Sequence, residues 1–100
     1  MELIDISNYQ EKIATGLALV DFFADWCRPC KLLEIELEAL AKQFVDISFF
    51  RVNTDEQRVL VRQLKIVSLP SLLLYRDGKL LKEINGYYPK EVLAKLLNLY

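Results

Sequence analysis

Apolar runs and amphipathic segments alternate along this chain, and their periods predict its secondary structure. Residues 17–24, LALVDFFA, are apolar apart from Asp21, a pattern typical of a strand buried on both faces. Residues 2–6 and 47–53 are predicted to be further strands. A helix is predicted to follow residues 17–24, because apolar residues recur there with helical spacing. They are Leu33, Leu37, Leu40, Ala41 and Phe44.

Capping signals mark the predicted starts of the other helices. Ser7 and Thr54 are each followed three residues later by Gln, the spacing of a capping box. They predict helices over about residues 8–15 and 55–64. Pro89 predicts the start of a last helix, because proline is tolerated in a first helical turn. The apolar face of that helix is predicted to consist of Val92, Leu93, Leu96, Leu97 and Tyr100.

Asp77-Gly78 lies between two apolar segments, residues 72–75 and 80–84, and is typical of a β-hairpin turn. The segments together have the order βαβαβαββα. This order predicts an α/β fold with a central mixed β-sheet flanked by helices on both faces. No long linker divides the chain, so residues 1–100 are expected to form one domain.

Composition and charge narrow the classes of function. The 100 residues are 53% hydrophobic and 27% charged, which is globular composition. A formal net charge of −1 gives no basic field to attract nucleic acid or an anionic membrane. The first twenty residues lack a basic segment leading into a long apolar run, so no signal peptide is predicted. No window has the roughly 18 apolar residues of a membrane span. A cytoplasmic protein is therefore expected.

The only cysteines, Cys27 and Cys30, lie between the strand at 17–24 and the helix that follows. Half of a metal site, a structural disulfide and a redox-active pair are the candidate explanations. A structural zinc site takes four ligands, mostly Cys and His, and the chain has no His and no third Cys. A disulfide closing a loop of about four residues adds only about 2 kcal/mol of stability. A redox pair is favoured, because a helix N-terminus stabilises an exposed Cys27 thiolate and places a more shielded Cys30 one turn away.

Two segments resemble the thioredoxin family: VDFFADWCRPCK around the cysteines, and SLPSLLLYRDGKL with its proline and hairpin. The resemblance covers nearly the whole chain. It implies a thioredoxin fold and a protein-disulfide reductase, acting in electron transport and cell redox homeostasis. The implied partners are client proteins that contain disulfides and an NADPH-dependent thioredoxin reductase. No cofactor and no metal of its own is expected, and a monomer is expected.

The resemblance also implies roles for the residues of the redox centre. Cys27 matches the attacking nucleophile, and Cys30 matches the thiol that resolves the mixed disulfide. Asp21 matches a buried acid that takes the proton of the resolving cysteine, and burial is expected to raise the pKa of its carboxyl. The alternative is a structural aspartate with hydrogen bonds in the core. Arg51 either pairs with Asp21 or keeps its head in solvent.

Four further residues match the surface of the family that contacts clients. Trp26 matches an exposed aromatic beside the thiol, the alternative being a packing tryptophan. Leu69-Pro70 matches a cis peptide bond facing Cys27, the alternative being an ordinary proline at the start of a strand. Gly86 matches a second client-facing loop, and it could equally be a plain turn glycine.

Arg28 departs from the most familiar family motif, which has Gly at this position. A cation in the first turn opposes the helix dipole, so Arg28 is expected to favour the neighbouring thiolate. Together with Pro29 it is predicted to tune the redox pair. Two other functions remain open: an oxidant or isomerase-like relative with the same fold, and a subunit that binds a partner regardless of its redox state.

Overall fold

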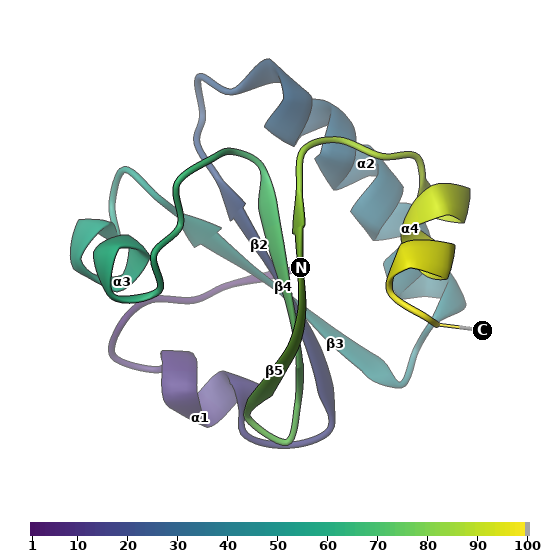
Figure 1. The fold of residues 1–100 in the computed structure, drawn as a ribbon, viewed down its shortest axis with the longest axis horizontal. Coiled ribbons are helices and arrows are strands. Elements are labelled where there is room, and N and C mark those ends of the chain that lie inside the picture. The colour runs from purple at the N-terminus through teal and green to yellow at the C-terminus, as the bar shows by residue number, and fades with distance from the viewer. Residues whose placement is uncertain (100) are drawn as a thin grey trace.

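A five-stranded sheet runs through the middle of the molecule, with helices on both of its faces (Figure 1). The computed structural model describes residues 1–99. The order of its elements is the predicted βαβαβαββα. The elements are β1 (Glu2–Leu3), α1 (Tyr9–Ile13), β2 (Leu17–Phe23), α2 (Arg28–Gln43), β3 (Ile47–Asn53), α3 (Arg58–Gln63), β4 (Ser71–Arg76), β5 (Lys79–Asn85) and α4 (Lys90–Leu96).

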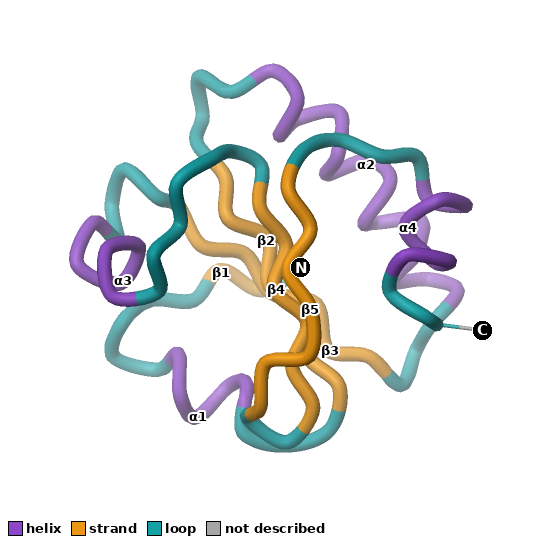
Figure 2. Tube along the Cα trace, viewed as in Figure 1, coloured by secondary structure: helices purple, strands orange, loops and turns teal. Residues whose placement is uncertain are grey.

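The sheet is mixed, as predicted, and its strand order is β1-β3-β2-β4-β5 (Figure 2). The neighbours β1 and β3 are parallel, and so are β3 and β2. The pairs β2 with β4 and β4 with β5 are antiparallel. The β4–β5 hairpin turns at Asp77 and Gly78, both with positive φ, of 50° and 82°. That geometry matches the right-handed twist of the two strands and explains the Asp-Gly sequence.

Two apolar cores, one on each face of the sheet, explain why β2 is apolar along its length. Val20 and Phe22 point to the face covered by α1 and α3. Leu19 points to the other face, against α2 and α4. Since side chains alternate along a strand, Asp21 points to the α2 side as well. The one carboxylate of β2 therefore lies beneath the helix that carries the cysteines.

Two predictions for the start of the chain are wrong. The strand expected over residues 2–6 is limited to Glu2–Leu3. Ser7 does not cap α1: its backbone N–H and its hydroxyl both donate to Asp5 Oδ1, at 2.8 and 2.5 Å. The residue preceding the helix is Asn8, whose Oδ1 accepts from the backbone N–H of Asp5 at 2.9 Å. The polar side chains that could cap the helix are therefore used in hydrogen bonds within the preceding turn.

The second capping prediction is also wrong. The Thr54 hydroxyl donates to the carbonyl of Phe23 at 2.9 Å, which joins the ends of β3 and β2. The backbone N–H groups of Asp55 and Glu56 instead donate to Asn53 Oδ1, at 3.0 and 3.2 Å. This turn delays the helix, and α3 begins only at Arg58.

The last helix follows its prediction with small differences. Pro89 is the residue before α4, and the helix itself begins at Lys90. Leu93 and Leu97 are buried against α2 and the sheet, whereas Val92 is exposed. The part of the prediction that falls on Tyr100 lies outside the described residues.

Candidate functional site

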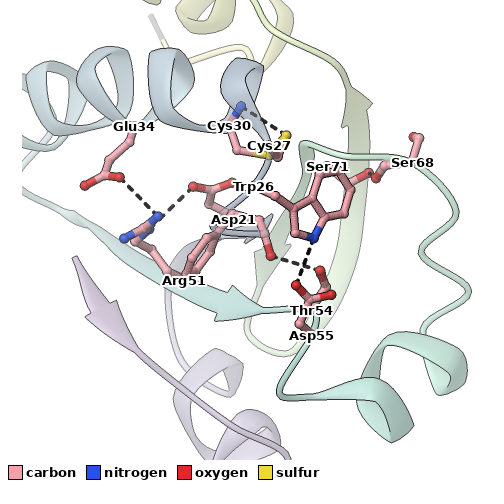
Figure 3. Close-up of a disulfide and its surroundings, with 11 residues drawn as sticks. Asp21, Trp26, Cys27, Cys30, Glu34, Arg51, Thr54, Asp55, Ser68 and Ser71 are labelled. Carbon is pink, nitrogen blue, oxygen red and sulfur yellow. Dashed lines mark hydrogen bonds and ion pairs between the residues drawn. A yellow bond between two sulfur atoms is a disulfide. The ribbon is translucent and has the colours of Figure 1, made fainter.

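A disulfide between Cys27 and Cys30 lies where β2 passes into α2 (Figure 3). Cys27 is the residue before the helix, and its Sγ accepts the backbone N–H of Cys30 at 3.3 Å. The two Cα atoms are 5.3 Å apart. Pro29 lies in the first turn, where the missing N–H costs no intrahelical hydrogen bond. The sequence therefore places both sulfurs at the positive end of the helix dipole.

Burial differs little between the two cysteines in this disulfide form. Cys27 is 5% exposed and Cys30 is 1% exposed, and both pack against Phe23 and Ala24. The expectation of an exposed Cys27 is therefore wrong for the oxidised state. What separates the two residues is the pocket that each one borders. Cys27 borders a pocket of about 650 Å³, and Cys30 borders a different one of about 280 Å³.

The pocket beside Cys27 has mostly apolar walls. One wall is formed by Trp26, Arg28 and Pro29, and the opposite wall by α3 and the residues that follow it. Those residues are Val61, Ile66, Val67, Ser68 and Leu69. Val67, in the segment after α3, is 89% exposed, so its apolar side chain is accessible from solvent. An extended apolar segment of another chain fits the chemistry of this pocket.

The Leu69-Pro70 peptide bond is cis, as the family resemblance implies. Leu69 packs against the disulfide and lines the pocket. The carbonyl of Pro70 accepts the backbone N–H of Gly86 at 2.8 Å. Gly86 has a φ of 96°, a conformation that glycine adopts without strain. The two predicted client-facing loops are therefore neighbours.

Ser71 joins these two loops through its side chain, which the sequence did not reveal. Its hydroxyl oxygen lies within hydrogen-bond distance of two oxygens, the carbonyl of Ser68 at 2.6 Å and Asn85 Oδ1 at 2.9 Å, which share its one proton. Ser71 is fully buried, so these partners satisfy a hydroxyl that has no access to water. The network fixes the backbone on both sides of the cis peptide bond.

Trp26 is 72% exposed, so the alternative of a packing tryptophan is excluded. Its indole Nε1–H donates to Asp55 Oδ2 at 2.9 Å. This bond holds the ring at the edge of the Cys27 pocket with an apolar surface toward solvent (Figure 3). No sequence signal pointed to Asp55, since nothing local relates it to Trp26.

Asp21 is 1% exposed and faces Arg51, its register partner on β3. Asp21 Oδ2 lies 3.7 Å from Arg51 Nε, an ion pair without a hydrogen bond. Neither carboxylate oxygen has a hydrogen-bond partner among the described residues. Burial raises the pKa of Asp21 to about 7, while Arg51 opposes the rise and Glu34 adds to it. The expectation of a raised pKa is confirmed.

Arg51 pairs with carboxylates and does not keep its head in solvent. Its Nη2 lies 3.2 Å from Glu34 Oε1, and its guanidinium carbon lies 3.8 Å from the centre of the Phe23 ring. Figure 3 shows the guanidinium between Glu34 and Asp21. The helical period of the apolar residues in α2 gave no sign of this contact between Glu34 and β3.

Over residues 1–99, no group of three or more His, Cys, Asp or Glu side chains is arranged to hold a metal ion. The helices within the same range are too short or too polar to cross a membrane.

Comparison with known proteins agrees with this site. The thioredoxin family pattern matches residues 1–99. The thioredoxin of Chlamydia trachomatis is 37% identical over 98 residues, which are 98% of this chain and 96% of the relative. That of Staphylococcus haemolyticus is 37% identical over 95 residues, 92% and 89% of the two chains.

Two solved structures superpose over almost the whole chain. A Plasmodium falciparum thioredoxin has a TM-score of 0.91 at 26% identity, covering 100% of this chain and 99% of its own. Chlamydomonas reinhardtii thioredoxin f2 has a TM-score of 0.91 at 30% identity, covering 99% and 94%. With a CxxC disulfide at the start of α2 and a cis-proline loop packed against it, the chain belongs to the thioredoxin family of thiol–disulfide oxidoreductases, which reduce protein disulfides.

Proposed function

We propose that this protein-disulfide reductase uses Cys27 as its nucleophile and Cys30 as its resolving thiol. The observation that carries the proposal is the position of Cys27, at the N-terminus of α2 and on the border of the apolar pocket of about 650 Å³. A client disulfide reaches Cys27 through that pocket. Cys30 borders no part of that pocket, and its sulfur is bonded to the sulfur of Cys27.

The exchange runs in two balanced steps. In the first, the Cys27 thiolate attacks one client sulfur, so a mixed disulfide forms and the other client sulfur leaves as a thiolate. In the second, Cys30 loses its proton and attacks Cys27, which releases the second client sulfur as a thiolate. The client gains two electrons and takes up protons from solvent. The chain loses the two electrons and is left with the Cys27–Cys30 disulfide.

Asp21 is proposed to accept the Cys30 proton in the second step. It points to the α2 side of the sheet, and burial leaves its carboxyl with a pKa of about 7. A group with that pKa both takes and releases a proton near neutral pH, which a base in a repeated cycle needs. A purely structural aspartate would have hydrogen bonds to its oxygens, and these oxygens have none within residues 1–99.

Clients are proposed to bind across Trp26, Leu69, Pro70 and Gly86. The first two line the Cys27 pocket, and the other two are joined by a backbone hydrogen bond beside it. Arg28 lies on the border of the same pocket and is exposed. With Pro29 in the first turn of the helix, it is proposed to tune the redox pair by favouring the thiolate.

The wider role is inferred from family membership. We propose recharging by an NADPH-dependent thioredoxin reductase, a place in electron transport and cell redox homeostasis, a cytoplasmic location and a monomeric state. Residues 1–100 are proposed to act as one domain, an inference supported by the single sheet that unites elements from β1 to β5.

Trapping distinguishes the roles of the two cysteines. The Cys30→Ser variant is expected to accumulate a mixed disulfide between Cys27 and disulfide-bonded insulin, because the variant has no second thiol to resolve it. The Cys27→Ser variant is expected to form none. Mass mapping after brief iodoacetamide treatment of the reduced wild type is expected to find Cys27 modified first. Preferential modification of Cys30 would reverse the assignment.

The two rival functions predict different results. Equilibration with glutathione buffers is expected to give a potential in the range of reductants, near −270 mV rather than −120 mV. An oxidant would have a potential of about −120 mV. If the double Cys→Ser variant still captures the partners of the wild type, the chain is a redox-independent binding subunit instead.

A further inference from the structure

Arg51 stands between two carboxylates and lies closer to Glu34 than to Asp21. Its Nη2 is 3.2 Å from Glu34 Oε1, and its Nε is 3.7 Å from Asp21 Oδ2. Both contacts are ion pairs, and the shorter one carries the stronger attraction. Arg51 Nε has no hydrogen-bond partner among the described residues, although it is buried. The guanidinium is therefore committed to Glu34, the more exposed of the two acids.

Glu34 also borders the pocket beside Cys30. That pocket of about 280 Å³ has Cys30, Glu34, Arg51 and Asn53 among its lining residues. It shares no lining residue with the pocket beside Cys27. The ion pair of α2 with β3 thus lies on the side of the disulfide away from the proposed client pocket, next to the cysteine that must lose a proton.

We propose that Glu34 is a positioning residue for the proton transfer: by drawing the Arg51 guanidinium toward itself, it weakens the ion pair of Arg51 with the Asp21 carboxylate, so that Asp21 can take the Cys30 proton. This inference rests on the proposed role of Asp21 as proton acceptor. It adds a residue that the sequence pattern did not mark and gives it a defined electrostatic task.

The charges around Asp21 support one direction of effect. On β3 it faces Arg51, on β4 its register partner is the apolar Leu72, and from α2 the charge of Glu34 acts on it. With Asp21 protonated, Arg51 and Glu34 form a neutral pair. With Asp21 ionised, the same three groups carry one uncompensated negative charge in a buried place, which is costly.

Glu34 therefore favours a protonated Asp21 in two ways: its own charge repels the carboxylate, and its closer ion pair with Arg51 offsets part of the attraction of the guanidinium for Asp21. Asp25 and Lys31 line the pocket beside Cys30 as well, but both are exposed, so solvent screens their charges.

Breaking the Arg51–Glu34 pair from either end provides the test, because the two variants should shift Asp21 in opposite directions. Glu34→Gln removes the repulsion and frees Arg51, so Asp21 should titrate at lower pH. Arg51→Met removes the cation that forms an ion pair with Asp21, so Asp21 should titrate at higher pH. If the pair had only a structural role, both variants would lose stability, and the titration of Asp21 would not shift in opposite directions. Glu38→Gln, an exposed change of equal charge on the same helix, is the matched control.

The readout is the carbon-13 chemical shift of the Asp21 carboxyl in the oxidised protein, where neither cysteine titrates. We expect Glu34→Gln to lower the midpoint by at least about half a pH unit, Arg51→Met to raise it by a similar amount, and Glu38→Gln to leave it within about 0.2 unit. The pH profile of insulin reduction should move in the same directions. In an Asp21→Asn background, Glu34→Gln should no longer move the profile.

The proposal is overturned if Glu34→Gln leaves the Asp21 midpoint unchanged or raises it, or if the kinetic shift persists in the Asp21→Asn background. Should Arg51→Met fail to fold, the comparison of Glu34→Gln with Glu38→Gln decides alone. The carboxyl titration does not depend on turnover. If the wild type did not reduce disulfides, the proposed function would fail while the electrostatic role of Glu34 could still be measured.

Discussion

Replacing Asp21 by Asn should remove a large part of the pH dependence of stability of the folded chain. Asp21 is 1% exposed, and its pKa in the folded protein is raised to about 7, chiefly by burial. In the unfolded chain the carboxyl is solvated, and its pKa is close to the ordinary value of 3.8. Between these two values the folded state holds a proton that the unfolded chain has released.

Proton linkage gives the sign and the size of the resulting pH dependence of stability. Because the folded state binds more protons in this window, its stability falls as the pH rises, by about 1.4 kcal/mol per pH unit. Below the unfolded pKa the stabilisation is complete, and above about 7 it is lost. Between pH 5 and pH 8 the wild type should therefore lose roughly 2.5 kcal/mol through this one group. Asn cannot ionise, so its own effect on stability is the same at both values of pH.

Guanidinium denaturation of the oxidised protein, followed by circular dichroism at pH 5 and pH 8, measures this difference. The Asp21→Asn variant should show a much flatter dependence and be the more stable protein at pH 8. Asp46→Asn, a change at an exposed aspartate, should follow the wild type. If the curves of the wild type and of Asp21→Asn run parallel from pH 5 to pH 8, Asp21 does not exchange its proton in this range and cannot be the base proposed for Cys30.

Three further changes test separate parts of the structure. Arg28→Gly should lower the reduction potential by at most about 20 mV, because an exposed cation adds no more than about 1 kcal/mol to the Cys27 thiolate, and a shift near 100 mV in a glutathione titration would contradict this. Glu36→Ala should cost about 1 kcal/mol in denaturant unfolding with unchanged activity, since Glu36 Oε1 accepts the backbone N–H of Lys90 at 2.9 Å at the start of α4. Trp26→Ala should raise KM for insulin several-fold but leave the rate with a small aromatic disulfide nearly unchanged; equal losses with both substrates would place the effect on the cysteines.

The fold was predictable because its strands and helices differ clearly in period. The run at 17–24 is apolar on both faces because β2 lies between two layers of helices. The Asp77-Gly78 turn carries its own conformational signal, and both residues have the positive φ that the signal implies. Where the period of apolar residues reflects burial on one or both faces, sequence and structure agree.

Helix starts were predicted less well, because a capping pattern describes what a short polar side chain can do and not which partner it finds. Ser7 has the required spacing, yet Asp5 lies two residues away and accepts its hydroxyl. Thr54 has it too, but the end of β2 brings the carbonyl of Phe23 within 2.9 Å. In both places another acceptor competes with the helix N-terminus for the hydroxyl.

The centre of the site could be read from sequence because Cys27 and Cys30 are neighbours on one helix, whereas its supporting contacts join distant segments. Trp26 and Asp55 are 29 residues apart in sequence, and Ser71 and Asn85 are 14 apart. No local period relates such pairs. They exist because the strands align the ends of their connecting loops at one edge of the sheet, so only the folded structure brings them together.

If clients bind as proposed, the placement of the two pockets separates the electron transfer from the proton transfer. On that proposal, a client held in a mixed disulfide would occupy the pocket beside Cys27 and displace water from its apolar walls. The resolving step takes place while the client is still attached, so a proton leaving Cys30 by that side would meet the bound chain. The pocket beside Cys30 has a different lining, with Glu34 and Arg51 at its border. Arg51, the ion-pair partner of Asp21, borders this opening, and we propose that protons leave the Asp21 region on this side during the covalent stage. Changes on the Cys27 side should therefore alter client affinity, and changes at Glu34 should alter the pH dependence of turnover.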